Sequence, residues 1–156
     1  MTDSPIQRGD VRFAGGGGRV GPVLVLAVDR LGFADVLLMH TATEMACDID
    51  LVVPRAVSEM TFDLVVEPDL RAMVWLWQLS PALGRLDDDV LDALTVQDPG
   101  GALGGAPWRG LPLAGPSDPR WQFKKDEGAT LRILSRDCTK AMLALSDRTV
   151  NKENVH

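Results

Sequence analysis

The stretch GPVLVLAVDRLGFADVLLMHTATEMACDIDLVV, from Gly21 to Val53, decides the fold that the sequence predicts. A turn signal at 29–32 and a polar cluster at 40–44 divide it into three short apolar runs, Val23–Val28, Val36–Met39 and Asp50–Val53. Short β-branched runs bounded by Gly, Asp and Pro are typical of buried strands. Two of these strands end together at the polar cluster, which could present a binding face.

Further strands and one helix are predicted on either side of this stretch. Strands are expected at Gly9–Ala14, Thr61–Val66 and Leu70–Leu79. A helix is expected over Asp87–Leu94, because Asp87 is a good N-cap residue, acidic residues follow it, and apolar residues recur at helical spacing. Trp75 and Trp77 are expected in a core or a dimer interface rather than on a base-stacking surface.

The order of these elements resembles a known family. A strand opener at Arg8–Val11 is followed by a glycine-rich loop, a Gly-Pro-Val-Leu-Val-Leu strand, a strand that ends at Thr41 and an Asp-Leu-Val-Val strand. This order is similar to that of the MazF/PemK/Kid toxins, endoribonucleases of type II toxin–antitoxin systems, over roughly residues 8–95. The resemblance implies a mainly β (α+β) SH3-like small barrel with a short C-terminal helix. It also implies a homodimer and a cognate antitoxin or other protein partner.

The same resemblance implies metal-independent cleavage of single-stranded RNA. Ribonucleases of this family use an Arg that stabilises charge on the phosphate, a Thr that contacts the phosphate, and the RNA 2′-hydroxyl as nucleophile. Thr41 matches the family Thr by its place at the strand end before Asp50. The family Arg would stand immediately before Pro22, where this chain has Gly21, so Arg19 is the nearest catalytic candidate.

Four further residues are predicted to contact the substrate. Thr43 lies on the face of Thr41 if the strand continues. Gly17 and Gly18 belong to a run of glycines that can let the backbone approach a phosphate, with a flexible hairpin loop as the alternative. His40 can act as an acid or base. Adjacent strand residues point to opposite faces, so a structural or exposed His40 is the alternative.

Two hypotheses about function follow from these residues. The first is a toxin-like, metal-independent endoribonuclease that acts on single-stranded RNA. The second is a barrel of the same type that has lost catalysis and works as a protein- or RNA-binding module, regulatory or structural, in a larger assembly. The missing Arg and the acidic composition favour the second hypothesis, whereas the element order, Thr41 and Arg19 favour the first.

The composition restricts the kinds of partner and cofactor that are expected. The net charge is −6, and an acidic barrel argues against non-specific nucleic-acid binding through a broad positive field. Cys47 and Cys138 stand outside any Cys/His pattern, so no metal and no cofactor is predicted, and a cytoplasmic location fits two such cysteines. The apolar runs are too short to cross a bilayer, and no signal peptide is expected.

The composition changes near residue 98. Residues 98–119 are rich in Gly and Pro and are predicted to form an extended or mobile linker, which Trp108 and Leu111 could pin to a surface. Beyond it, the patterns favour short strands at 121–123 and 130–134, with a turn at 126–128, and a short helix at 136–145. The predicted division is a barrel domain 1–97, a linker 98–119 and a small basic C-terminal extension 120–156 that makes few contacts with the core.

Overall fold

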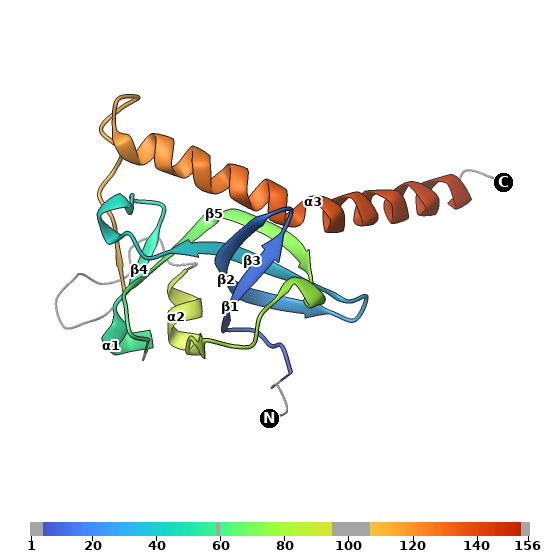
Figure 1. Ribbon diagram of the computed structural model, residues 1–156, viewed down its shortest axis with the longest axis horizontal. Coiled ribbons are helices and arrows are strands. Elements are labelled where there is room, and N and C mark those ends of the chain that lie inside the picture. The colour runs from blue at the N-terminus through green and yellow to red at the C-terminus, as the bar shows by residue number, and fades with distance from the viewer. Residues whose placement is uncertain (1–4, 59, 95–106, 154–156) are drawn as a thin grey trace.

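The computed structural model describes residues 5–58, 60–94 and 107–153 (Figure 1). One antiparallel sheet contains β1 (Asp10–Gly16), β2 (Arg19–Asp29), β3 (Phe33–His40), β4 (Leu51–Val53), β5 (Leu64–Trp75), β6 (Gly84–Arg85) and β7 (Trp108–Arg109). Around it lie the helices α1 (Arg55–Ser58), α2 (Asp88–Ala93) and α3 (Pro119–Glu153) and the 3-10 helices η1 (Thr43–Met45) and η2 (Leu76–Gln78). The strands predicted within the opening stretch are confirmed as β2, β3 and β4.

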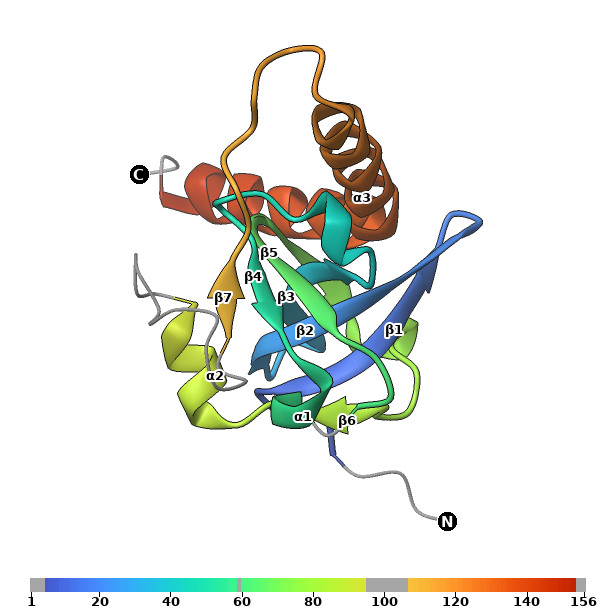
Figure 2. The ribbon, with the colours of Figure 1, turned by 90° about the vertical axis from the view of Figure 1, so that its left-hand side faces the viewer.

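The sheet curls into a half-barrel with the strand order β6-β1-β2-β3-β5-β4-β7 (Figure 2). The pairing of β2 with β3 shifts in register after Val25, and the pairing of β3 with β5 shifts after Leu37. Such bulges bend and twist a sheet. The prediction of a mainly β, SH3-like fold is confirmed in this half-barrel form. Within the part of the chain that the structure describes, the edge strands β6 and β7 do not pair with each other.

Strand β5 is one continuous element where two strands were predicted, at Thr61–Val66 and Leu70–Leu79. A bulge that contains Pro68 interrupts its pairing with β3. Proline is tolerated there because it has no ladder hydrogen bond to lose. The prediction of a strand as far as Leu79 is wrong, because the chain turns into η2 after β5. Trp77 therefore lies outside the strand and is 73% exposed.

Helix α2 closes the apolar core on one face of the sheet. Its Val90 and Leu91 are buried in a cluster that includes Met39 and other strand residues. The predicted helix over Asp87–Leu94 is confirmed, with Asp87 at the N-cap position, although the Asp87 side chain makes no capping hydrogen bond. This packing fixes one side of β3, the strand that leads into the polar cluster.

Helix α3 covers the opposite face and differs most from the prediction (Figure 1). The short strands expected at 121–123 and 130–134 are wrong, since a single helix spans Pro119–Glu153. The expectation of few contacts with the core is wrong too, because Leu131 and Leu134 are buried against β2, β3 and β5. Burial of this apolar face outweighs the roughly 1 kcal/mol cost of a glycine, Gly128, inside a helix.

The described part of the predicted linker is held against the sheet. Strand β7 pairs with β4, and Trp108 packs on the small cluster of Ala46, Val52 and Val65. Residues 98–106 of the linker lie outside the described residues. Leu111 is exposed, and its backbone forms an isolated bridge to Cys47. The division of the chain into folding domains stays a prediction.

Candidate functional site

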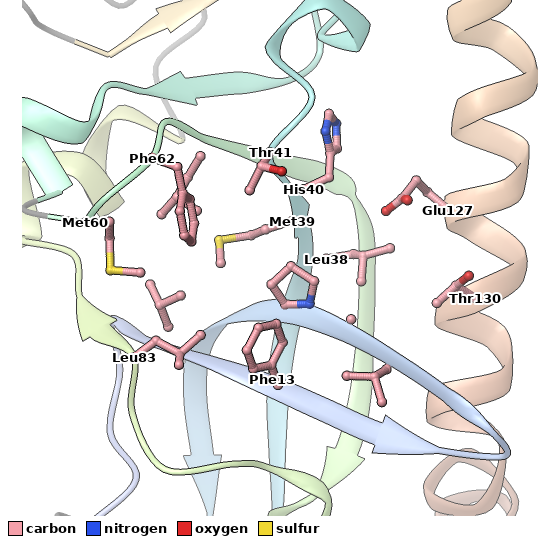
Figure 3. Close-up of a pocket in the computed structure, with 15 residues that line it drawn as sticks. Phe13, Leu38, Met39, His40, Thr41, Met60, Phe62, Leu83, Glu127 and Thr130 are labelled. Atoms are coloured by element: carbon pink, nitrogen blue, oxygen red, sulfur yellow. The ribbon is translucent and has the colours of Figure 1, made fainter.

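A cavity of about 400 Å³ opens between the β1–β2 hairpin, the end of β3, the segment around Met60 and helix α3 (Figure 3). Most of its wall is apolar and includes Pro22, Met39 and Met60. A neighbouring hollow of about 310 Å³ shares Met60 and three further lining residues with it. The cavity and this hollow together are called the apolar groove below.

Large exposed apolar side chains surround the apolar groove. Phe13, Val20, Phe62 and Leu83 line it, and their exposed fractions are 41%, 70%, 40% and 42%. Strand β6 pairs with Asp10 and Val11 of β1, and Ser80 takes both backbone hydrogen bonds of Phe13, so the Phe13 backbone is paired while its side chain is exposed beside the groove. Single exposed apolar residues are ordinary, but a contiguous exposed patch marks an interaction site.

One end of the apolar groove is polar. His40 and Thr41 reach it from the end of β3, and Glu127 and Thr130 from α3 (Figure 3). The expectation that adjacent His40 and Thr41 would not line one groove is wrong. Strand β3 ends at His40, so the strict alternation of a strand no longer applies to Thr41.

His40 is a neutral imidazole with a defined tautomer. The backbone N–H of Ala42 donates a hydrogen bond to His40 Nδ1 at 3.1 Å, so the ring proton lies on Nε2. Burial lowers the pKa of His40 to about 4, and the ring packs edge-to-face against Phe123 at a centroid distance of 4.7 Å. Within the described residues, His40 Nε2 has no hydrogen-bond partner; Glu67 Oε1 lies 3.9 Å away.

Behind His40, a buried charge cluster ties α3 to the sheet. Lys124 Nζ donates hydrogen bonds to Asp50 Oδ1 at 2.6 Å and to Asp69 Oδ1 at 2.8 Å, and it contacts Glu67 Oε1 at 3.3 Å. The side chains of Asp50 and Glu67 are fully buried. Asp50 Oδ2 also accepts the backbone N–H of Cys47 at 3.0 Å. The amine therefore holds together three carboxylates that would otherwise repel one another.

Glu67 and Glu127 form a carboxyl pair next to this cluster. Burial raises the pKa of Glu67 to about 8, and burial also raises the pKa of Glu127. The two carboxyl groups lie close together, and the neighbouring Asp50 carboxylate also disfavours ionisation of Glu67. At neutral pH Glu67 therefore favours its protonated form.

The cluster does not have the form of a metal site. Donor atoms of His40, Asp50 and Glu67 lie within 4.8 Å of one another. However, the amine of Lys124 already contacts Asp50 and Glu67. A metal-bound His donates its second ring N–H to an acceptor, whereas His40 Nδ1 accepts an N–H and Nε2 carries the proton. The donor set therefore fits an internal ion pair better than a cation ligand set.

The structure brings together only part of the predicted site. Thr41 and His40 line the groove, but Arg19, Gly17, Gly18 and Thr43 are not among its lining residues. Arg19 is exposed at the start of β2, where it pairs with Gly16. The two glycines form the hairpin turn, with φ of 57° and 80°, and Thr43 begins η1.

Gly21 occupies the position at which the resemblance implies the catalytic Arg. A Cβ atom there would lie 3.3 Å from Leu38 Cδ1, 3.7 Å from Leu134 Cδ1 and 3.9 Å from Thr130 Cγ2. Helix α3 thus packs close to this position, and a side chain there would have to displace the end of Leu38 and pass Leu134 and Thr130. Strand alternation directs Arg19 to the same face of β2 as Gly21, the face on which α3 packs.

Sequence reasoning missed Glu67, Lys124 and Glu127. A signal for the two α3 residues was present, because 124, 127, 131, 134 and 138 recur at alternating steps of three and four residues, as on one helix face. Glu67 carried no local signal, because a single Glu within an apolar strand does not indicate which residue it will pair with. None of the helices in the described ranges is long and apolar enough to cross a membrane.

Comparisons with known proteins link the chain to toxin structures. No family model matches the sequence, and no curated protein matches it. The structure is similar to an endoribonuclease solved in complex with its cognate antitoxin from a Mycobacterial species. That match has 15% identity and a TM-score of 0.47, over 60% of this chain and 90% of that chain. It is also similar to the Mycobacterium tuberculosis toxin MazF-mt6, at 21% identity and a TM-score of 0.44, over 55% of this chain and 87% of that chain.

Proposed function

We propose that this chain is a protein-binding module built on a toxin-like half-barrel, and that its apolar groove takes an apolar segment of a partner protein. The observation that carries the proposal is the character of the groove. Exposed Phe13, Val20, Phe62 and Leu83 surround it, and within the described residues no lysine or arginine lines the cavity. Large apolar side chains are the anchors of protein interfaces.

The same features disfavour RNA as the ligand of this groove. Binding of RNA depends on cations that neutralise phosphates, and cleavage by the family mechanism needs a positioned cation at the phosphate. The polar end of the groove instead carries the carboxyl group of Glu127. Gly21 replaces the implied Arg, and α3 covers that position.

Cleavage of single-stranded RNA without a metal is the second candidate function. The family resemblance implies it, and one observation favours it: Thr41 lies in the same cavity as His40, a group able to carry or release a proton. For this mechanism Arg19 would have to supply the positive charge, although Arg19 is not among the residues that line the cavity.

One pair of experiments separates the two functions. A random peptide library displayed on phage is selected on the wild-type protein, with counter-selection on the folded Phe62→Ser variant. Peptides that need Phe62 but tolerate Leu143→Ser, an exposed apolar residue on the distal part of α3, support the binding module. Cleavage of long single-stranded RNA in EDTA, lost in both Arg19→Ala and Thr41→Val, would instead establish the nuclease.

A homodimer is a separate part of the proposal. Leu31 and Trp77 are 65% and 73% exposed. The N–H of Leu76, in η2, donates to the carbonyl of Gly32, so η2 lies against the β2–β3 turn that contains Leu31. This second apolar surface lies outside the lining of the groove and is a suitable contact between two copies. The groove then stays available for an antitoxin or another protein partner.

A further inference from the structure

The polar end of the apolar groove lies in a strongly acidic part of the molecule. Glu127 lines the cavity, and Asp50, Glu67 and Asp69 lie behind it around a single amine, that of Lys124. Lys124 contacts three carboxylates, so its charge is already shared. A group that enters the cavity therefore meets unbalanced negative charge.

Two buried polar atoms at this end have unmet hydrogen-bonding capacity within the described residues: His40 Nε2 and Glu67 Oε2. His40 is 7% exposed and lines the cavity, and Glu67 is fully buried. Buried polar atoms without partners are rare in folded proteins and call for an explanation. Of the two residues only His40 lines the cavity, so a ligand that enters this end of the groove would supply a partner for His40 Nε2.

We propose that the apolar groove recognises a segment in which a basic side chain, Arg or Lys, lies next to the apolar anchors and pairs with Glu127 at the polar end. This inference rests on the proposed function, because it names the chemistry of the partner that the groove takes. Charge complementarity selects the occupant, since a phosphate or a carboxylate would face Glu127, and the described residues of the cavity wall include no lysine or arginine.

The exchange at Glu127 balances in charge. Without a ligand, burial favours the protonated form of Glu67, which lies beside Glu127. When the guanidinium or ammonium group enters, the carboxyl O–H bond breaks, its proton passes to solvent, and carboxylate oxygens accept N–H hydrogen bonds from the cation. No other covalent bond changes. His40 Nε2–H is then available to donate to a backbone carbonyl of the bound segment.

Other charged groups that face the carboxyl pair set the size of this effect. They are Lys124 and Asp126 on α3, Asp50 before β4, Asp69 on β5 and His40 on β3. His40 is neutral at neutral pH, and the amine of Lys124 is bound by three carboxylates. Proton release on binding is therefore expected to come from the Glu67–Glu127 pair.

The test uses groove-binding peptides from the phage selection, resynthesised with each basic residue replaced by citrulline. Citrulline keeps the shape of Arg but carries no charge. We expect the wild-type protein to bind the Arg peptide about tenfold or more tightly than the citrulline peptide. Glu127→Gln should remove this preference, and Asp137→Asn, an exposed carboxylate on the same helix, should keep it.

Calorimetry in two buffers of different ionisation enthalpy gives a second measurement. Binding of the Arg peptide at pH 7 should release protons from the wild-type protein but not from Glu127→Gln, whose folding is checked by its melting temperature. The inference would be overturned if the selected peptides contained no basic residue, or if the Arg and citrulline peptides bound with equal affinity. In either case, binding that depends on Phe62 would still support the groove as a protein-binding site. If no peptide depends on Phe62, the proposed function fails, and the inference fails with it.

Discussion

Replacing Lys124 with Met tests whether the buried charge cluster holds α3 on the sheet. Methionine keeps the apolar stem that packs in the interface but removes the ammonium group. Asp50, which is fully buried, would then keep the backbone N–H of Cys47 and lose its 2.6 Å partner. Glu67 can respond by remaining protonated, and Asp69 is partly exposed, so the main cost comes from Asp50.

The size of the effect follows from these burials. Breaking a buried ion pair by removing one partner costs about 3–5 kcal/mol. We expect the loss of unfolding free energy in Lys124→Met to lie near the lower limit, about 3 kcal/mol. Of its three carboxylate partners, Glu67 can stay protonated and Asp69 can be solvated, which leaves only Asp50 as an unpaired buried charge. Asp50→Asn in the Lys124→Met background removes the uncompensated charge and should recover much of that loss. The double-mutant cycle should give a coupling energy of about 2 kcal/mol.

Urea unfolding at pH 7, followed by far-UV circular dichroism, measures these free energies. Lys140→Met is the matched control, because Lys140 is exposed on the same helix, and it should change the free energy of unfolding by less than about 0.5 kcal/mol. If Lys124→Met were no more destabilising than Lys140→Met, or if the cycle were additive, the cluster would not hold α3. The buried contacts of Leu131 and Leu134 would then account for its docking.

Three further predictions concern stability and assembly. Gly128→Ala should raise the free energy of unfolding by about 0.5–1 kcal/mol, since the added methyl meets only ordinary contacts, whereas Gly18→Ala should lower it because φ is 80° there. The raised pKa of Glu67, about 8 against 4.5 when unfolded, should make the free energy of unfolding fall as pH rises from about 4.5 to 8. The lowered pKa of His40, about 4 against 6.5 when unfolded, acts in the opposite direction between about 4 and 6.5, so pH 6.5–8 isolates the effect of Glu67. In that range urea titrations should show a flatter profile for Glu67→Gln than for the wild type. Light scattering should find a wild-type dimer and a Trp77→Ser monomer, and a wild-type monomer at high micromolar concentration would contradict the interface.

The sequence predicted elements whose signal is local. Strands β2, β3 and β4 were found because apolar β-branched runs alternate with clear turn residues, and α2 because capping and periodicity agree. Two of the wrong predictions also have local causes. The Glu-Pro-Asp segment in β5 looked like a break but forms a bulge, and the Asp-Glu-Gly segment around Gly128 looked like a turn although it lies inside α3. In both, tertiary packing overrode a local preference.

The candidate site could be predicted only where it depends on the chain near one strand end. Thr41 and His40 were found because they follow β3 directly. Lys124 and Asp50 are 74 residues apart, and Lys124 and Glu67 are 57 residues apart. Their contact depends on how α3 docks, which neither composition nor periodicity specifies. The acidic character of the groove was therefore not predictable residue by residue, although the acidic composition of the barrel was consistent with it.

Gly21 and helix α3 occupy the same part of the sheet surface. A Cβ atom at position 21 would approach Leu38, Leu134 and Thr130, so the glycine before Pro22 lets α3 pack closely here. Docking of α3 in turn brings Glu127 to the polar end of the groove. The helix that lies over the position to which the family resemblance assigns a cation thus contributes an anion. An Arg at position 21 would have to displace the end of Leu38 and pass Leu134 and Thr130, at a cost in the packing of α3. The packing of α3 beside Gly21 therefore creates the acidic end of the groove, which is the end that the binding proposal uses.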